Sequence, residues 1–222
     1  MKSNIIELNS LFVIKEEDVI MGFTKKSLPF REDNINRILS EIEIDNLDLK
    51  IIHLSQVHSN RIIYIDEHTD FYKIAGDGLI SSCRNVFLYI RTADCIPLFL
   101  WNQNYVGILH CGWRSLACGI LNNLEYFLDF KSTKFLIGPG IRKCCYKISE
   151  DLISYFPQNV FRKDSQLYLD LVEVIVENMH KKGAKLENIE DSKFCTSCRN
   201  DLFFSYRKEK TQERIVNFIV RV

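Results

Sequence analysis

The chain has 222 residues, of which 46% are hydrophobic and 26% are charged, an ordinary balance for a globular protein. Its 29 basic and 29 acidic residues give a formal net charge of zero, so no global field would draw it to nucleic acid or anionic lipid. No apolar run approaches the roughly 20 residues that a membrane span needs. From the charge and the apolar runs together, we expect neither nucleic acid nor a membrane as a partner.

Strand-like segments occur along the whole chain. Most are rich in β-branched and aromatic residues and are separated by turn residues, the pattern that favours strands. The predicted strands are residues 11–15, 19–23, 49–54, 61–65, 78–81, 86–92, 97–101, 105–110, 134–137, 203–206 and 214–222.

Fewer segments predict helices, namely residues 34–44, 115–130, 150–156 and 167–182. Apolar residues recur at helical spacing in the second of these, and Gly183 with preceding lysines ends the last. Because strands cluster and helices are few, we predict an α+β fold with mixed β-sheets flanked by helices. No repeat or linker divides the chain, which predicts a single domain over residues 1–222.

A cysteine and a histidine stand at matching ends of a predicted hairpin. Cys95 lies between the strand-like run 86–92 and the first arm of the hairpin, residues 97–101. His110 ends the second arm, residues 105–110. A short polar turn between the two arms of the hairpin would bring the side chains together at one end. The pair is either a nucleophile with its base or two ligands of a metal ion.

A third candidate is His58, which follows the predicted strand 49–54. One cysteine with two histidines suits zinc, with copper as the alternative. Three protein ligands leave one tetrahedral position open, as in catalytic zinc sites, where the pKa of bound water falls to about 7. Against this, no local motif binds the three residues together, and Cys95 could be an unrelated core residue.

Several short motifs follow one another in a fixed order from about Leu49 to the C-terminus. Together they resemble the bacterial laccase-domain family, also called polyphenol-oxidase-like proteins. The motifs are residues 56–58 (QVH), 76–80 (GDGLI), 92–97 (TADCIP), 110–114 (HCGWR), 138–141 (GPGI), 195–196 (CT) and 203–207 (FFSYR).

This resemblance implies an enzyme. Members of the family are described mainly as purine nucleoside phosphorylases that also have adenosine deaminase activity. Their metal ligands match His58, Cys95 and His110. The implied substrates are phosphate and adenosine, inosine or methylthioadenosine, which would yield the base and ribose 1-phosphate, and the protein would be a monomer or small homo-oligomer.

Two further residues have candidate roles in these reactions. Arg114 follows Gly112 near the start of a helix predicted from Ser115, so it could hold phosphate; otherwise it is a surface arginine that pairs with acids of its own helix. Asp77 lies between two glycines and could orient a ligand histidine or act as an acid or base, although a plain turn aspartate is equally compatible. Asp94, next to Cys95, is similarly open.

The N-terminal third departs from the family pattern. A loop of the form Thr-Arg-x-Gly-Gly is typical there, whereas this chain has residues 24–28 (TKKSL). Lys25 would keep a positive charge but lose the bidentate grip of a guanidinium on phosphate. A Thr-Gly-Arg motif near the end is altered to residues 211–214 (TQER). We therefore expect a changed substrate preference or rate.

Three other functions remain open from the sequence. Cys95 and His110 could form a metal-independent cysteine hydrolase, or the metal could serve stability alone in a binding protein. A copper-dependent polyphenol oxidase is the third, but the chain has five histidines and no His-x-His pair, which is too few for a trinuclear copper cluster.

The chain contains eight cysteines. The N-terminus has no apolar signal-peptide core, so we predict a cytoplasmic protein whose cysteines stay reduced. Cys195 and Cys198 form one CxxC, either a redox pair or half of a zinc site. Adjacent Cys144 and Cys145 could complete a four-cysteine site only if the fold brings the two segments together.

Overall fold

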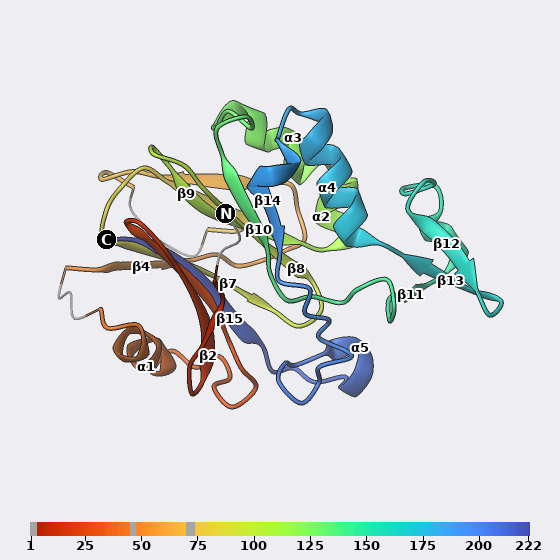
Figure 1. Cartoon of the computed structure of the whole chain (residues 1–222), viewed down its shortest axis with the longest axis horizontal. Helices are drawn as coiled ribbons and strands as arrows, with labels where there is room; N and C mark the ends of the chain where they lie inside the picture. The colour runs from red at the N-terminus through yellow and green to blue at the C-terminus, as the bar shows by residue number, and fades with distance from the viewer. Residues whose placement is uncertain (1–3, 45–47, 70–73) are drawn as a thin grey trace.

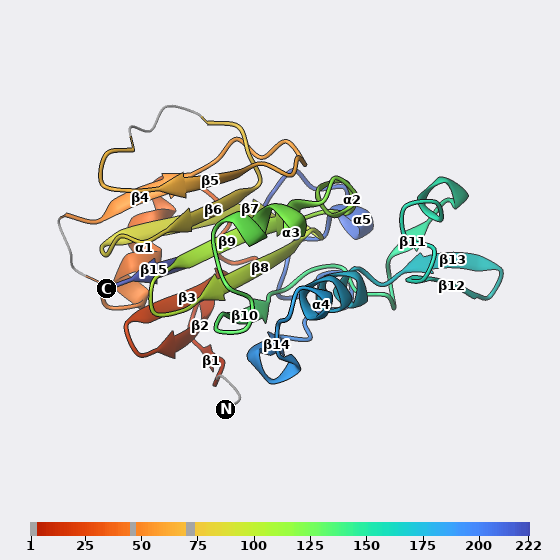
Figure 2. The same ribbon diagram turned by 90° about the horizontal axis from the view of Figure 1, so that it is seen from above.

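The computed structural model describes residues 4–44, 48–69 and 74–222. Two six-stranded sheets lie face to face, and helices cover the outer face of each (Figures 1 and 2). The predicted α+β class with mixed sheets is confirmed. No helix in the described part of the chain is long and apolar enough to cross a membrane.

The C-terminal strand lies inside the first sheet. It pairs antiparallel with strands from the N-terminal part and from the middle of the chain, and the last strand of the sheet runs parallel to its neighbour. In spatial order the strands are β1 (Ile6–Glu7), β2 (Leu11–Glu16), β3 (Val19–Thr24), β15 (Ile215–Arg221), β7 (Val86–Thr92) and β4 (Lys50–His53).

The second sheet has the predicted hairpin at its centre. Its order is β14 (Ile189–Asp191), β10 (Lys134–Ile137), β8 (Ile96–Trp101), β9 (Val106–Cys111), β6 (Gly78–Ser81) and β5 (Ile62–Ile65). A small separate sheet consists of β11 (Lys147–Ile148), β13 (Gln166–Leu169) and β12 (Val160–Lys163), which project to one side in Figure 1.

Alternating side chains explain the layers. In β7, Leu88 and Ile90 enter the core between the sheets, whereas Phe87 and Tyr89 face outward. The outward pair packs in the layer covered by α1 (Asn34–Glu41). On the other side, α2 (Trp113–Ala117), α3 (Ile120–Asn123) and α4 (Leu171–Lys181) pack on the second sheet. The strand period of two thus supplies apolar surface to both faces of each sheet.

The predicted helix 115–130 is wrong in its continuity. The segment contains α2, then α3, then a 3₁₀ turn at Leu124–Tyr126. Gly119 has a left-handed backbone (φ 81°) between the two helices, and this conformation ends the first of them. The helical spacing of the apolar residues survives because both short helices face the same core.

Three other segments differ from the prediction. The predicted helix 167–182 begins later, because residues 167–169 belong to β13; its end before left-handed Gly183 (φ 95°) is confirmed. The helix predicted at 150–156 is only a 3₁₀ turn, Glu150–Leu152. Residues 203–206 are not a strand: Phe203 and Phe204 are buried in a turn that leads into α5 (Tyr206–Glu209).

The core between the sheets gives a stability prediction. Phe99 of β8 is fully buried there, so Phe99→Ala should lower the free energy of unfolding by about 3–5 kcal/mol through lost burial and a cavity. Tyr126→Ala is the control, because this side chain is 84% exposed and its loss should change stability by no more than about 0.5 kcal/mol. Urea unfolding of both variants measures the difference; equal midpoints would contradict this assignment of the core.

Candidate metal centre and pocket

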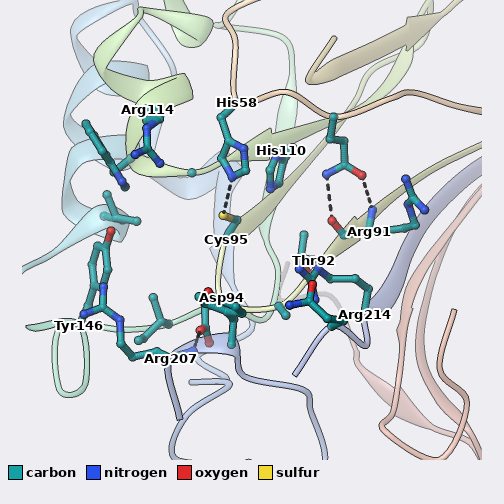
Figure 3. A pocket seen from close by; sticks show the side chains of 18 residues that line it. His58, Arg91, Thr92, Asp94, Cys95, His110, Arg114, Tyr146, Arg207 and Arg214 are labelled. Carbon is teal, nitrogen blue, oxygen red and sulfur yellow. Dashed lines mark hydrogen bonds between the residues drawn. The ribbon is translucent and has the colours of Figure 1, made fainter. Parts of the chain in front are cut away.

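Three side chains from distant segments meet at one end of the second sheet. The antiparallel register of β8 and β9 places Pro97 opposite His110, so Cys95, two residues earlier, lies beside the histidine. His58 comes from the loop after β4 with a left-handed backbone (φ 58°). Its Nε2 lies 3.7 Å from Cys95 Sγ, and one ligand atom from each of the three residues lies within 4.8 Å of the others (Figure 3).

A buried carboxylate links both histidines. Asp77 is fully buried and accepts a hydrogen bond from His110 Nδ1 at 2.8 Å. It also accepts from the backbone N–H of His58 at 3.0 Å and from the hydroxyl of Ser59 at 2.8 Å. With Nδ1 of His110 engaged, Nε2 is the ring nitrogen that remains for a ligand contact.

The charges of these groups depend on one another. Burial alone would raise the pKa of Asp77, but hydrogen bonds from His110 and Ser59 outweigh it and lower the value to about 2. Burial likewise disfavours the Cys95 thiolate, yet His110 and His58 lower its pKa to about 6. Burial opposes a charged His110, whereas Cys95 and Asp77 raise its pKa to about 9. The site therefore favours a thiolate, the form that binds metal ions.

Gly112 leaves the space that these side chains occupy. A Cβ atom at this position would lie 3.0 Å from Cys95 Sγ and 3.0 Å from His58 Cδ2, closer than ordinary contacts. The glycine in the HCGWR motif is therefore required by close approach of backbone to the three-residue cluster.

The donor set fits a borderline-soft ion. One thiolate and two imidazoles are typical of zinc and also suit copper, and the carboxylate behind His110 is the usual outer partner of a metal-binding histidine. Three protein ligands leave a tetrahedral ion one further position. All three side chains line a pocket of about 750 Å³, so a substrate in the pocket could reach such an ion.

Arginines surround the rest of this pocket. Among the ion pairs of the described residues, none places a carboxylate within 4.0 Å of their guanidinium groups. Their positive charge is therefore available to an anion in the pocket. The four are Arg91, Arg114, Arg207 and Arg214, and Figure 3 shows them on both sides of the cluster of His58, Cys95 and His110.

Aromatic rings and carbonyl groups hold three of these arginines. The guanidinium of Arg91 lies over the Phe30 ring, 4.7 Å from its centroid. That of Arg207 donates to the Lys147 carbonyl at 2.8 Å, and that of Arg214 donates to the Glu213 carbonyl at 2.9 Å. None of these contacts neutralises the charge.

Arg114 lies inside its helix, whereas the predicted helix begins only after it. Helix α2 begins at Trp113 and not at Ser115, with Gly112 as its N-cap. Helix α2 contains no acidic residue, and the ion pairs of the described residues include none of Arg114, so the alternative that it pairs with acids of its own helix is wrong. The guanidinium of Arg114 lies instead over the Trp113 ring, 4.4 Å from the centroid.

Asp94 does not face the three candidate ligands. Its Oδ1 accepts from the Thr196 hydroxyl at 2.7 Å, and its Oδ2 accepts from the Arg207 backbone N–H at 2.6 Å. The carboxylate therefore joins the Cys95 turn to the segment that contributes Arg207. Its left-handed backbone (φ 91°) helps to turn the chain at this point.

Three of the four pocket arginines were not predicted from the sequence as functional residues. Arg207 lay in a recognised motif, but the segment was predicted as a strand; Arg214 lay in an altered motif, and Arg91 in no motif. Lys25 was expected near the phosphate, and the structure contradicts this: its ammonium group contacts Glu7 at 2.7 Å and the Leu8 carbonyl at 2.7 Å. It does not line the pocket.

Comparison with known proteins agrees with the motif series. Residues 31–222 match the family model described as "Multi-copper polyphenol oxidoreductase laccase", and the chain belongs to this family. The purine nucleoside phosphorylase of Aquifex aeolicus is 30% identical over 168 residues, covering 74% of this chain and 80% of that protein. The purine nucleoside phosphorylase of Borreliella burgdorferi is 30% identical over 214 residues, covering 86% and 88%.

The fold has also been seen in a crystal structure. The Bacillus licheniformis hypothetical protein YfiH superposes with a TM-score of 0.85 at 25% identity, covering 97% of this chain and 98% of that one.

The contact between Asp77 and His110 yields a prediction about metal affinity. Asp77→Asn should weaken zinc binding by about 10–100-fold, because the amide no longer fixes the His110 ring as a charged acceptor. Competition with a chromogenic chelator measures the affinity, and circular dichroism checks that the variant is folded. Asp66→Asn is the control, since the hydrogen bonds of this aspartate to other described residues stay within its own turn, to His68 and Thr69. Unchanged zinc affinity in Asp77→Asn would remove the positioning role.

Proposed function

We propose that the protein is a zinc-dependent purine nucleoside phosphorylase that also deaminates adenosine. The observation that carries this proposal is a single pocket that combines a His58–Cys95–His110 cluster with four arginines free of carboxylate partners among the described residues. The names of the relatives from Aquifex aeolicus and Borreliella burgdorferi support the same activity. Adenosine, inosine and methylthioadenosine are the proposed nucleosides.

His58, Cys95 and His110 would hold the zinc ion, with copper as the competing occupant. When bound, the ion would supply Lewis-acid character and water activated at neutral pH. Asp77 is proposed as a positioning residue, because its carboxylate contacts the His110 ring and the backbone of His58. Its burial and its pKa of about 2 disfavour a role as a proton donor.

Phosphorolysis joins a phosphate oxygen to C1′ of the ribose and breaks the bond from C1′ to the purine nitrogen. The bond's electron pair leaves with the purine, which takes up a proton. Guanidinium groups suit this reaction because they bind phosphate oxygens in a bidentate way. Arg114 is the proposed principal phosphate contact, and the other pocket arginines would share the charge.

The purine base needs a flat apolar surface. Trp113, Tyr146 and Tyr206 line the same pocket and offer aromatic faces. Deamination replaces the C6 amino group of adenine by oxygen from water and releases ammonia. It needs no phosphate, so the two activities would depend differently on the arginines.

The alternative of a cysteine hydrolase keeps one supporting observation, the low pKa of Cys95. It would operate without metal and would be blocked by alkylation of that thiol. A multicopper oxidase is less favoured, because five histidines without a His-x-His pair cannot supply a trinuclear cluster.

The direct test is an assay with elemental analysis. We expect purified protein with phosphate to convert adenosine to adenine and ribose 1-phosphate, with some inosine, as resolved by chromatography. Thorough metal removal should abolish both products and added zinc should restore them. His58→Ala should behave like the metal-free protein. Absence of product from adenosine, inosine and methylthioadenosine would refute the proposal, and activity that survives metal removal would refute the zinc dependence.

Arg114 gives a prediction that separates the two reactions. Arg114→Ala should lower kcat/KM for phosphorolysis by about 10–100-fold, the loss of one charge-assisted hydrogen bond of about 1.5–3 kcal/mol. Deamination in the absence of phosphate should fall much less. Arg162→Ala is the matched control, since Arg162 is exposed on β12 outside the pocket. Equal losses in both activities would contradict a phosphate contact.

A further inference from the structure

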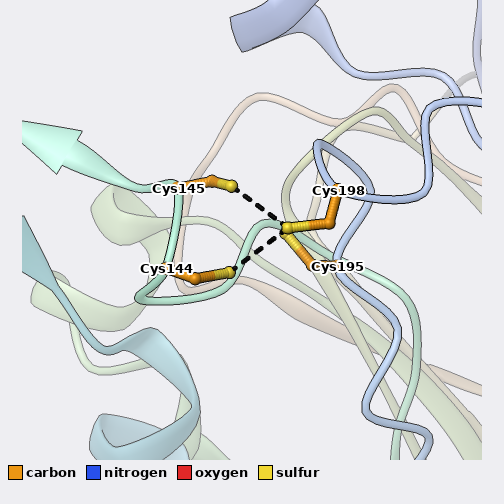
Figure 4. A group of neighbouring side chains, drawn as sticks. All are labelled: Cys144, Cys145, Cys195 and Cys198. Carbon is orange, nitrogen blue, oxygen red and sulfur yellow. Dashed lines mark hydrogen bonds between the residues drawn. The ribbon is translucent and has the colours of Figure 1, made fainter.

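The two cysteine pairs noted in the sequence come together. Cys144 and Cys145 lie on the turn before β11, and Cys195 and Cys198 lie on the turn after β14 (Figure 4). The Cys198 sulfur is 3.6 Å from that of Cys144 and 3.4 Å from that of Cys145. All four sulfurs lie within 4.8 Å of one another.

We propose that these four cysteines form a second, structural zinc site, separate from the His58–Cys95–His110 cluster. Tetrahedral zinc with sulfur at about 2.3 Å requires sulfurs about 3.8 Å apart, close to the contacts observed. A disulfide needs sulfurs about 2.05 Å apart, which none of these pairs shows. Four soft thiolates around one point select zinc or iron, and sulfurs this close enclose a single ion without room for bridging sulfide. The proposal does not depend on the activity proposed above.

The main chain holds the two turns together apart from the thiols. Gly140 N–H donates to the Phe194 carbonyl at 3.2 Å, and Thr196 N–H donates to the Gly140 carbonyl at 3.1 Å. The buried guanidinium of Arg142 reinforces the junction, donating to Asp191 Oδ1 at 2.8 Å and to the Phe194 carbonyl at 3.1 Å. The four sulfurs therefore converge on a framework that fixes their positions.

Cys195 is the only one of the four cysteines that is buried, with 6% of its surface exposed. The Arg199 N–H donates to the Cys195 carbonyl at 2.8 Å and closes the tight turn of the CxxC. A positive charge nearby would offset the negative charge that four thiolates bring to one ion. Lys208 adds a nearby cation, since its Nζ donates to the Ser197 carbonyl at 3.2 Å.

This position links the proposed zinc to the pocket. Tyr146 follows Cys145 directly and lines the pocket. Thr196 lies between the two cysteines of the CxxC and donates to Asp94, the neighbour of Cys95. An ion held by the four thiolates would therefore fix one segment of the pocket wall and a second segment that is bonded to the wall, although none of the four cysteines lines the pocket.

Counting zinc in matched variants tests the proposal. Reduced wild-type protein should contain about two zinc ions per chain, and the Cys144→Ser/Cys198→Ser double variant about one. His58→Ala should also lose about one, because it leaves the four-cysteine site intact. Cys118→Ser is the control, an exposed thiol outside both clusters, and should retain both ions. Zinc content in the double variant equal to that of wild type would overturn the proposal.

Thiol reactivity in the wild-type protein keeps the test independent of variants that fail to fold. Cys118, Cys144 and Cys198 are all exposed to iodoacetamide, and each thiol is compared with itself before and after chelation, because reactivity depends on the thiol's own surroundings as well as on exposure. With zinc bound, Cys144 and Cys198 should be alkylated several-fold more slowly than after chelation, whereas the rate at Cys118 should not change. Rates at Cys144 and Cys198 that do not change on chelation, iron in place of zinc, or a disulfide among the four cysteines in protein kept from air would each overturn the assignment.

Discussion

The buried carboxylate of Asp77 is the interaction on which the candidate site depends. It lies just before β6, yet it contacts the ring of His110 at the end of β9 and the backbone of the loop that contains His58. An isolated buried charge would be unfavourable by several kcal/mol, so the hydrogen bonds from Ser59, His58 and His110 must form together. Formation of those bonds orients both histidines toward Cys95. The geometry of the cluster is therefore already specified by the protein's own contacts.

The sandwich explains why these residues can meet. Sheet pairing fixes β8 and β9 in the register that sets Pro97 opposite His110, and a slip of one residue would exchange the side chains of the two packed faces. Cys95 and His110 therefore stay adjacent at one end of the central strands, while the turns that carry Asp94 and His58 have left-handed backbone at these two residues. The regular strands fix where Cys95 and His110 lie, and the strained turns fix how the side chains around them are oriented.

Much of this arrangement could be predicted from local patterns. Most strands were found within a residue or two because alternation and turn residues are local signals, and the hairpin followed from them. The break at Gly119 was missed, since apolar spacing of 3.6 continues across it. The arginines of the pocket come from four separate segments, and their convergence depends on the tertiary fold. Lys25 was misplaced for the same reason: its neighbours, Glu7 and the Leu8 carbonyl, are distant in sequence.

Two adjacent residues of β9 show how the fold determines the reactivity of a cysteine. His110 faces the pocket, so the strand period of two turns Cys111 to the other side, into the apolar layer beneath α2. Burial there raises the pKa of Cys111 far above its ordinary range, and the charges of Cys95 and Asp77 add to that effect. Cys95, facing the two imidazoles across the hairpin, has its pKa lowered instead. Two thiols within one hairpin thus become an inert core side chain and a candidate metal ligand, and only the face of the strand distinguishes them.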